Sequence, residues 1–165
     1  MRQEHQRYNA EAMKILVSAC LLGINCKYDG GNNLCETVRA LMDDNVLIPV
    51  CPECLGKLPT PRVPSEIVGG MVTTAHGENV DRQFRDGAAQ ALEIARENNI
   101  DLAILQSRSP SCGLKQVYDG TFTGTLKTGR GVFAQMLTEK GYKTLDVEDL
   151  LNNAAGMLVS EEKRV

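Results

Sequence analysis

The sequence predicts an α/β fold, a Rossmann-like three-layer sandwich in which helices flank a mostly parallel central sheet. Two observations lead to this prediction. Short apolar runs alternate with segments of helical periodicity, and no internal repeat, low-complexity stretch or interdomain linker interrupts the alternation. The length of 165 residues is typical of one domain, which we expect to comprise residues 14–165 after a polar leader over residues 1–13.

Four short runs are predicted to be strands of this sheet. They are residues 15–17, 46–50, 102–105 and 143–145. The run 102–105 reads Leu-Ala-Ile-Leu, and a wholly apolar run is typical of a strand that is buried on both faces of a parallel sheet.

Helices are predicted between these strands and after the last one. The segments with helical spacing or end signals are residues 35–43, 80–98, 131–140 and 147–153. Gly141 is the expected C-terminal stop of the third. Residues 51–64 contain four prolines and are predicted to form a long, stiff loop. Residues 118–122 read Tyr-Asp-Gly-Thr-Phe and predict a turn between two short strands, because Asp-Gly tolerates positive φ angles.

Charge and hydropathy bear on the possible partners. The chain has 18 basic and 21 acidic residues, and this balance offers no basic surface for nucleic acid. Its apolar runs are far shorter than the roughly 20 residues that span a bilayer, and residues 1–12 lack the apolar run of a signal peptide. We therefore expect a cytoplasmic protein without nucleic-acid or membrane partners, present as a monomer or a small homo-oligomer.

The chain contains six cysteines. Six cysteines in 165 residues are about 3.6% of the chain, well below the roughly 8–10% that marks a secreted disulfide scaffold. In the cytoplasm thiols are kept reduced, so cysteine clusters there favour metal binding or catalysis over structural bridges.

Three cysteines share one position relative to the predicted sheet. Cys20 comes just after the first strand, Cys51 directly after the second, and Cys112 in the loop after the strand 102–105. Ligands of an open parallel sheet bind outside the carboxyl ends of its strands, so the sequence predicts a pocket lined by three thiolates. Such a pocket suits either zinc or an iron–sulfur cluster, and the spacing does not separate the two.

The other three cysteines have less certain roles. Cys35 lies on the apolar face of a predicted helix and is assigned to the core. Cys26 is close enough to Cys20 to be a fourth thiol at the same pocket, as a ligand, a proton donor or a spectator. Cys51 and Cys54 have the C-x-x-C spacing of a thiol–disulfide enzyme or of half a zinc site. A metal-binding module without catalytic activity and a thiol–disulfide enzyme are therefore alternative hypotheses.

Four motifs together resemble a known family. They read Ser-Ala-Cys-Leu-Leu-Gly from residue 18, Cys-Lys-Tyr-Asp-Gly from 26, Pro-Val-Cys-Pro-Glu from 49 and Ser-Pro-Ser-Cys-Gly from 109. In this order they resemble the domain-of-unknown-function family 523, in the short, single-domain form of the thiouracil desulfidases. The resemblance implies an enzyme that converts C=S to C=O in a thioamide or a thiolated nucleobase such as 2-thiouracil, releasing sulfide without net redox change.

The resemblance also implies a cofactor and its ligands. It implies a [4Fe–4S] cluster that is held by Cys20, Cys51 and Cys112. The fourth iron is left open to bind the substrate sulfur. A cluster with only three protein ligands is expected to be lost during aerobic purification.

The same motifs supply the expected catalytic residues. The resemblance points to Glu53 as the base that activates water and to Ser109 as the residue that orients substrate or water. Asp29 and Cys26 are secondary candidates for proton transfer. For Glu53, Ser109 and Asp29 the competing interpretation is structural, as solvated, helix-capping or turn-capping residues of loops.

Two further residues are candidates for binding substrate. Arg62 is placed to grip a polar ligand, although an arginine after Pro61 is more often part of a loop salt bridge. Ser111 lies beside Cys112, where serines commonly cap turns. The chain departs from the family pattern at Lys57, where a glycine is usual, and at Gln106, where a lysine is common.

Overall fold

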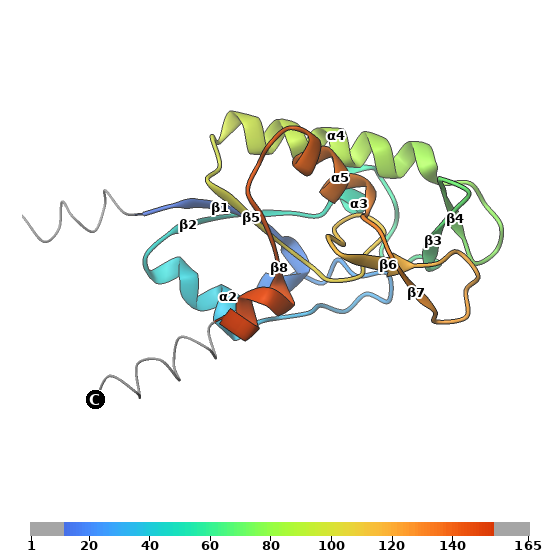
Figure 1. Cartoon of the computed structure of the whole chain (residues 1–165), viewed down its shortest axis with the longest axis horizontal. Coiled ribbons are helices and arrows are strands. Elements are labelled where there is room, and N and C mark those ends of the chain that lie inside the picture. Colours follow the sequence, from blue (N-terminus) through green and yellow to red (C-terminus); the bar gives the residue numbers. More distant parts are fainter. Residues whose placement is uncertain (1–11, 154–165) are drawn as a thin grey trace, which may run out of the picture.

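The structure is a computed structural model that describes residues 12–153 of the chain. Its centre is a four-stranded sheet in the order β2-β1-β5-β8, in which every neighbouring pair is parallel (Figure 1). The strands are β1 (Lys14–Ser18), β2 (Val46–Val50), β5 (Leu102–Leu105) and β8 (Thr144–Asp146). These correspond to the four predicted runs, with β8 displaced by one residue. The expected leader lies almost wholly outside the described residues, so the division into leader and single domain stays a prediction.

Helices cover both faces of the sheet. On one face α4 (Asp81–Glu97) and α5 (Val132–Glu139) pack against Leu16 and Leu105. On the other face α2 (Glu36–Ala40) and the helical residues 147–153 pack against Ile15, Val17 and Ile104. Neighbouring residues of a strand point to opposite faces, so each buried strand contributes to two apolar layers. The predicted three-layer α/β sandwich is confirmed.

The two helices of the first face form where the sequence predicts them. Along α4, Phe84, Ala88, Ala91 and Ala95 recur at helical spacing and are fully buried, and the alanines allow a close approach to the sheet. The helix ends before Asn99, which has a positive φ of 48°. After α5, Gly141 has a φ of 81°, the left-handed conformation of a helix stop.

The predicted loop over residues 51–64 is wrong at its start, because α3 (Pro52–Leu55) is a short helix. Its proline stands at the first helical position, where a fixed φ fits and the missing N–H is not needed. Two glycines let α3 approach the backbone of α4. A Cβ atom added at Gly87 would lie 1.8 Å from the carbonyl oxygen of Pro52, and one at Gly56 would lie 2.0 Å from that of Gln83. This contact fixes α3 and the residues on it.

Two small antiparallel hairpins lie together at one end of the molecule, away from the start of β1 (Figure 1). The first pairs β3 (Ser65–Val68) with β4 (Met71–Thr74) and was not predicted, although its turn Gly69-Gly70 has the positive φ angles of a tight hairpin. The second pairs β6 (Gln116–Tyr118) with β7 (Leu126–Thr128). Short strands were expected there, but the connection spans residues 119–125 and is longer than a two-residue turn.

The remaining elements complete the layers. A 3-10 turn, η1 (Ala19–Leu22), follows β1, and a second, η2 (Leu41–Asp43), continues α2 to the end of the predicted helix 35–43.

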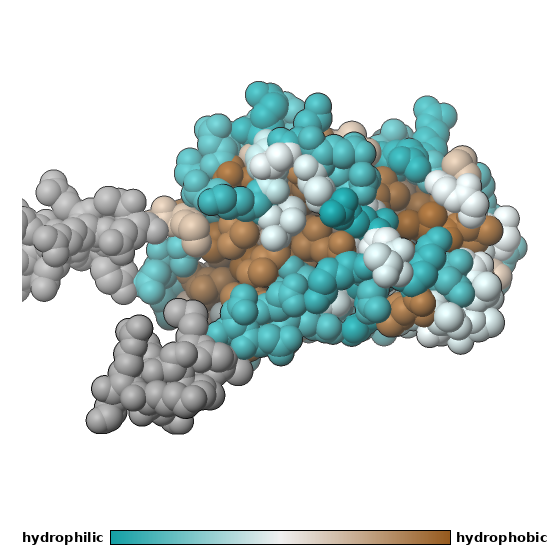
Figure 2. All heavy atoms as spheres, in the orientation of Figure 1, coloured by the Kyte–Doolittle hydropathy of each residue, from teal (hydrophilic) through white to brown (hydrophobic). Residues whose placement is uncertain are grey.

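On the face drawn in Figure 2, hydrophilic residues dominate the upper and lower margins, and apolar residues are exposed between them. Across the described residues, no helix combines the length and apolar character that a membrane crossing requires.

Candidate active site

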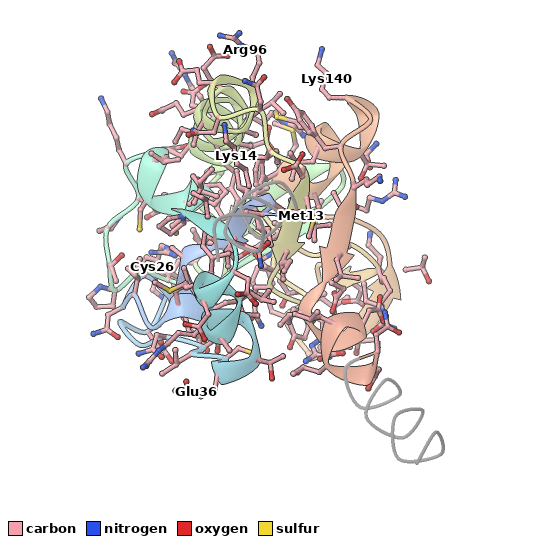
Figure 3. The ribbon with its side chains drawn as sticks, turned by 90° about the vertical axis from the view of Figure 1, so that its left-hand side faces the viewer. Met13, Lys14, Cys26, Glu36, Arg96 and Lys140 are labelled. Carbon is pink, nitrogen blue, oxygen red and sulfur yellow. The ribbon has the colours of Figure 1, made fainter. Side chains whose placement is uncertain are left out.

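A cavity of about 670 Å³ opens at the carboxyl ends of the central strands. Four cysteines line it. Cys20 belongs to η1 directly after β1, Cys51 lies between β2 and the first residue of α3, and Cys112 lies in the loop after β5. Cys26 contributes from the loop between η1 and α2, where Figure 3 shows it near the margin of the molecule. The structure thus places the three thiols expected as ligands, and a fourth, around one space.

The thiols of Cys20 and Cys26 influence each other. The pKa of Cys20 is lowered, chiefly by a hydrogen bond from the Cys26 thiol, while burial acts in the opposite direction. The same hydrogen bond raises the pKa of Cys26 to about 11. Asn33 Nδ2 also donates to Cys20 Sγ over 3.6 Å. Cys20 is therefore the member of the group that most readily forms a thiolate.

The other two thiols resist ionisation. A hydrogen bond with Cys26 and burial together raise the pKa of Cys51. Burial raises the pKa of Cys112 to about 12, against a hydrogen bond from Ser18 that lowers it. Several thiolates in one half-buried space repel one another, so full ionisation of the group requires a positive charge among them.

Backbone hydrogen bonds hold the loops that carry these cysteines. The amides of Gly23 and Asn33 both donate to the carbonyl of Cys20, at 3.2 and 3.0 Å, which folds the following loop back onto η1. In the third loop, Ser109 Oγ accepts the amides of Ser111 and Cys112, each at 3.0 Å. Ser109 thus lines the cavity and at the same time caps the turn that presents Cys112.

The first amides of α5 fix the third loop from its other side. Gly131 donates to the carbonyl of Gly113 at 2.8 Å, and Val132 donates to that of Pro110, also at 2.8 Å. A Cβ atom at Gly131 would lie 2.5 Å from the carbonyl carbon of Ser111. The start of α5 is therefore in backbone contact with the loop of Cys112.

A carboxylate on α3 stands beside the thiols. Glu53 lines the cavity with its side chain 17% exposed. Its Oε1 accepts from Arg62 Nε at 3.1 Å, and its Oε2 accepts from Ser111 Oγ at 3.2 Å. Because both oxygens are engaged by partners on other segments, the carboxylate is held in one orientation.

Arg62 connects three segments around Glu53. Its side chain is 7% exposed, and it donates to the carbonyls of Cys26 at 2.8 Å and Pro59 at 3.2 Å and to Thr60 Oγ1 at 3.0 Å. Burial alone would lower the pKa of Arg62, but the charge of Glu53 and the hydrogen bond to it outweigh this and raise it. These contacts occupy the guanidinium on the protein side of the cavity.

Four cysteine or site candidates lie outside the cavity lining, and one of them is Ser111, which is buried. Asp29 is half exposed, accepts a hydrogen bond from the amide of Gly31 at 2.9 Å and lies 3.9 Å from the ammonium of Lys27.

Cys54 is exposed, and its thiol hydrogen-bonds to Thr60 Oγ1 over 3.6 Å. Burial raises the pKa of Cys54, and the pKa of Cys51 is raised too, so neither thiol of the C-x-x-C pair is activated as a nucleophile. Cys35 packs against the apolar layer beneath α2, as expected.

Several residues of the cavity wall were not singled out from the sequence. Tyr28, Tyr118 and Phe122 place aromatic rings on it, and Glu66 on β3 reaches it from the first hairpin. Tyr28 lies inside the recognisable motif that begins at Cys26. Tyr118 and Phe122 bound the segment 118–122, which was predicted only as a turn. Glu66 carries no local signal, because its contact with Phe122 joins residues that are far apart in the sequence.

The fold and the cavity together define a class of protein, the α/β proteins with a thiol-lined site at the carboxyl edge of a parallel sheet. The sequence model of the 2-thiouracil desulfurase family matches residues 15–149. The chain therefore belongs to this family of sulfur-removing enzymes, as the motifs of the sequence had indicated.

Two individual proteins resemble the chain over most of its length. The uncharacterized protein YbbK of Bacillus subtilis (strain 168) is 42% identical over 146 residues, which cover 82% of this chain and 97% of that protein. A solved structure of the [4Fe-4S]-dependent thiouracil desulfidase TudS is 35% identical, with a TM-score of 0.78, and the match covers 89% of this chain and 99% of that one.

Proposed function

We propose that this protein is an iron–sulfur-dependent desulfidase that replaces the sulfur of a thiolated nucleobase such as 2-thiouracil with oxygen. Cys20, Cys51 and Cys112 hold a [4Fe–4S] cluster at the cavity. The observation that carries the proposal is the placement of these three cysteines, from three strand ends, around one cavity with the fixed carboxylate of Glu53. The [4Fe-4S]-dependent relative supports the choice of cofactor.

The donor set fits such a cluster. Soft thiolates are the usual ligands of iron–sulfur centres, and the positive charge of iron would offset the effects that keep Cys51 and Cys112 protonated, the hydrogen bond with Cys26 and burial for Cys51 and burial for Cys112. Within residues 12–153, no three His, Cys, Asp or Glu side chains gather around a single metal-ion position. A cluster does not require such convergence, because each cysteine binds a different iron atom.

The overall reaction is a hydrolysis, in which C=S and water give C=O and hydrogen sulfide. When bound, the cluster supplies a thiophilic Lewis acid that polarises the C=S bond. Glu53 accepts a proton from the water whose oxygen attacks the carbon, and it returns that proton to the departing sulfur. Water contributes both protons and the oxygen, so no electrons are gained or lost.

The neighbours of Glu53 are assigned positioning roles. Arg62 and Ser111 bind the two carboxylate oxygens from the protein side, and the other contacts of Arg62 are to loop carbonyls and a threonine. We therefore assign them to holding Glu53 and not to gripping the substrate. This differs from the substrate-binding role that the sequence suggested.

Of the remaining candidates, Ser109 and Cys26 line the cavity and Asp29 does not. The acceptor capacity of Ser109 Oγ is used by two amides, and its hydroxyl proton remains available to orient substrate or water. Cys26 hydrogen-bonds with the thiols of Cys20 and Cys51 and is the candidate proton donor beside the cluster. Asp29 is assigned to the turn that presents Cys26 and Tyr28.

Anaerobic reconstitution tests the proposal. The protein is incubated with ferrous iron and sulfide under nitrogen, desalted, and analysed for iron, acid-labile sulfide and zinc. We expect about four iron atoms per chain and a brown protein that converts 2-thiouracil to uracil and sulfide in equal amounts. A colourless protein that holds stoichiometric zinc and releases no sulfide would instead favour the metal-binding module.

A further inference from the structure

The cavity collects an unusual share of the aromatic side chains. The chain has three phenylalanines, four tyrosines and no tryptophan. Three of these seven residues, Tyr28, Tyr118 and Phe122, line the cavity. Phe84 and Phe133, by contrast, are fully buried in the core. Aromatic surface is thus concentrated at a concave site in a chain that has little of it.

Two of these aromatic rings are not covered by the protein itself. Tyr28 is 47% exposed and Phe122 is 37% exposed. Exposed apolar side chains at the wall of a cavity are typical of ligand-binding surfaces, where they take up the apolar part of a ligand while a few polar groups orient it. The available surface here is aromatic, which suits the face of a planar ring.

Phe122 is held at the cavity by a carboxylate of the other hairpin. Glu66 Oε1 accepts the amide of Gly120 at 3.0 Å and the amide of Phe122 at 3.1 Å. Phe122 has a φ of 57°, in the left-handed region that bulky residues rarely adopt. Such conformations persist only where the surroundings impose them, and they cluster at ligand-binding segments. The loop between β6 and β7 is therefore fixed in a conformation that it would not adopt alone.

Tyr28 is tied to the catalytic side of the cavity. Its carbonyl accepts the amide of Arg62 at 2.7 Å, and the following turn is closed by the amide of Gly30, which donates to the carbonyl of Lys27 at 3.0 Å. Because Arg62 also holds Glu53, the position of Tyr28 is coupled to that of the catalytic carboxylate.

We propose that Tyr28 and Phe122 form a stacking surface for the planar ring of the substrate, and that Glu66 is the positioning residue that holds Phe122 there. This inference rests on the proposed function and specifies its substrate class. The site selects thiocarbonyl groups that are part of a flat heterocycle over open-chain thioamides. Base-on-aromatic stacking is sequence-tolerant because every base has a π face, so the surface accepts different thiolated nucleobases.

The test compares a ring substrate with a ringless one on the reconstituted holoenzyme. For Phe122→Leu and Tyr28→Leu, we expect kcat/KM for 2-thiouracil to fall by about 5- to 100-fold, the range for loss of one base-stacking contact. Thioacetamide has no ring, and its turnover is expected to change by less than about twofold. Phe122→Tyr and Tyr28→Phe keep the ring and should retain the activity. Leu126→Ala is the matched control, since Leu126 is an exposed apolar residue of the same hairpin outside the cavity lining.

The positioning role of Glu66 has its own signature. Glu66→Ala removes the acceptor of both loop amides, and we expect it to reproduce the Phe122→Leu pattern, chiefly through KM. Glu66→Gln retains an amide oxygen that can accept the same N–H groups, so it should restore most of the lost affinity.

Calorimetric titration with uracil provides a readout that does not depend on turnover. We expect the wild-type protein to bind uracil and Phe122→Leu to bind it at least about fivefold more weakly. If wild-type protein binds uracil but releases no sulfide from 2-thiouracil, the proposed function fails and the stacking surface stands. The stacking surface is refuted if the leucine variants lose activity on 2-thiouracil and on thioacetamide equally. It is also refuted if the wild-type protein does not bind uracil or if Phe122→Leu leaves uracil binding unchanged.

Discussion

The two sides of the cavity are held by different combinations of backbone and side-chain contacts. One side, here called the strand-end wall, consists of η1, α3 with the preceding Cys51, and residues 106–114, and it carries Cys20, Cys51, Cys112 and Glu53. The other, the hairpin rim, consists of the β3–β4 and β6–β7 hairpins with their loops. The wall is fixed by backbone contacts, such as those of Gly56 and Gly87 between α3 and α4. The rim has one contact of this kind, since a Cβ atom at Gly120 would lie 2.6 Å from the carbonyl oxygen of Ile67, and it is also held by two side-chain carboxylates, Glu66 at the β6–β7 loop and Asp81 at β4.

This difference indicates which part of the cavity tolerates amino-acid substitution. At Gly56 and Gly87 an added Cβ atom would lie within about 2 Å of a backbone oxygen, so no side chain fits there and the wall holds its groups within narrow limits. The side-chain acceptors of the rim, by contrast, can be replaced by other acceptors, so its residues other than Gly120 can vary without loss of the fold. We expect changes in the wall to affect the cluster and turnover, and changes in the rim to affect substrate choice or local stability.

The largest effect is expected when a proposed ligand in the wall is replaced. Cys20→Ser, Cys51→Ser and Cys112→Ser each exchange a soft thiolate for a hydroxyl that binds iron poorly, so cluster content and turnover should fall to roughly 1% of wild type or less. Iron and sulfide analysis after anaerobic reconstitution measures this. Cys54→Ser is the matched control because Cys54 is exposed outside the cavity, and it should retain both. Loss of activity in Cys54→Ser alone would revive the thiol–disulfide enzyme.

The next largest effect distinguishes Glu53, the proposed base of the wall, from the proposed ligands of the cluster. Glu53→Gln preserves the shape and the contact with Ser111 but removes the base, so kcat should fall by about 10²- to 10⁴-fold at unchanged iron content. Glu93→Gln, a change at an exposed surface carboxylate, is the control. A Glu53→Gln enzyme with wild-type kcat would remove Glu53 from the mechanism.

A methyl group at Gly87 tests the backbone contact of the wall directly. Alanine is favoured over glycine by about 1 kcal/mol in an exposed helix, so a stabilising effect is the default expectation. Here the added Cβ would meet the carbonyl oxygen of Pro52, and we expect Gly87→Ala to lower the free energy of unfolding by about 2–3 kcal/mol and to reduce cluster content. Urea denaturation with iron analysis measures both. Asp86→Ala, beside it on the exposed face, should change stability by less than about 0.5 kcal/mol.

The smallest effect is expected in the rim. Asp81 is buried, and its Oδ1 accepts the amide of Val72 on β4 at 3.0 Å. Asp81→Ala leaves that amide without its acceptor, which should cost about 1–3 kcal/mol of stability and speed hydrogen exchange at Val72, while cluster content stays unchanged. Asp81→Asn keeps an acceptor oxygen and should recover part of the loss. A fall in iron content in Asp81→Ala would show that rim and wall are not independent.

The sequence predicted those features that local pattern and strand topology determine. Apolar runs and helical spacing placed the sheet, α4 and α5, and the rule for parallel sheets placed Cys20 and Cys112 near each other. The helix α3 was missed because prolines dominate its segment, although Pro52 itself is compatible with a helix start. Lys57 has a φ of 67°, which explains structurally why glycine suits this position.

The hairpin rim could not be derived in the same way. Glu66 and Phe122 are 56 residues apart, and nothing near either residue indicates the other. The partners of Glu53 illustrate the same limit, since Ser111 is 58 residues away. Residue types and motifs pointed to Arg62 and Ser111, but only the packed structure shows that both bind the carboxylate.

The positions of the three cysteines also bear on the order in which the protein matures. Cys20, Cys51 and Cys112 follow β1, β2 and β5, which are neighbours in the sheet although far apart in the sequence. Contacts between residues that are far apart in the sequence form late in folding, because long stretches of chain must be ordered before these contacts can stabilise the fold. The proposed ligand set is therefore complete only when the sheet has paired, and the proposed cluster is expected to be inserted into a folded chain. A cluster bound as proposed would tie three strands together, so its loss should weaken the whole sheet and not only one loop.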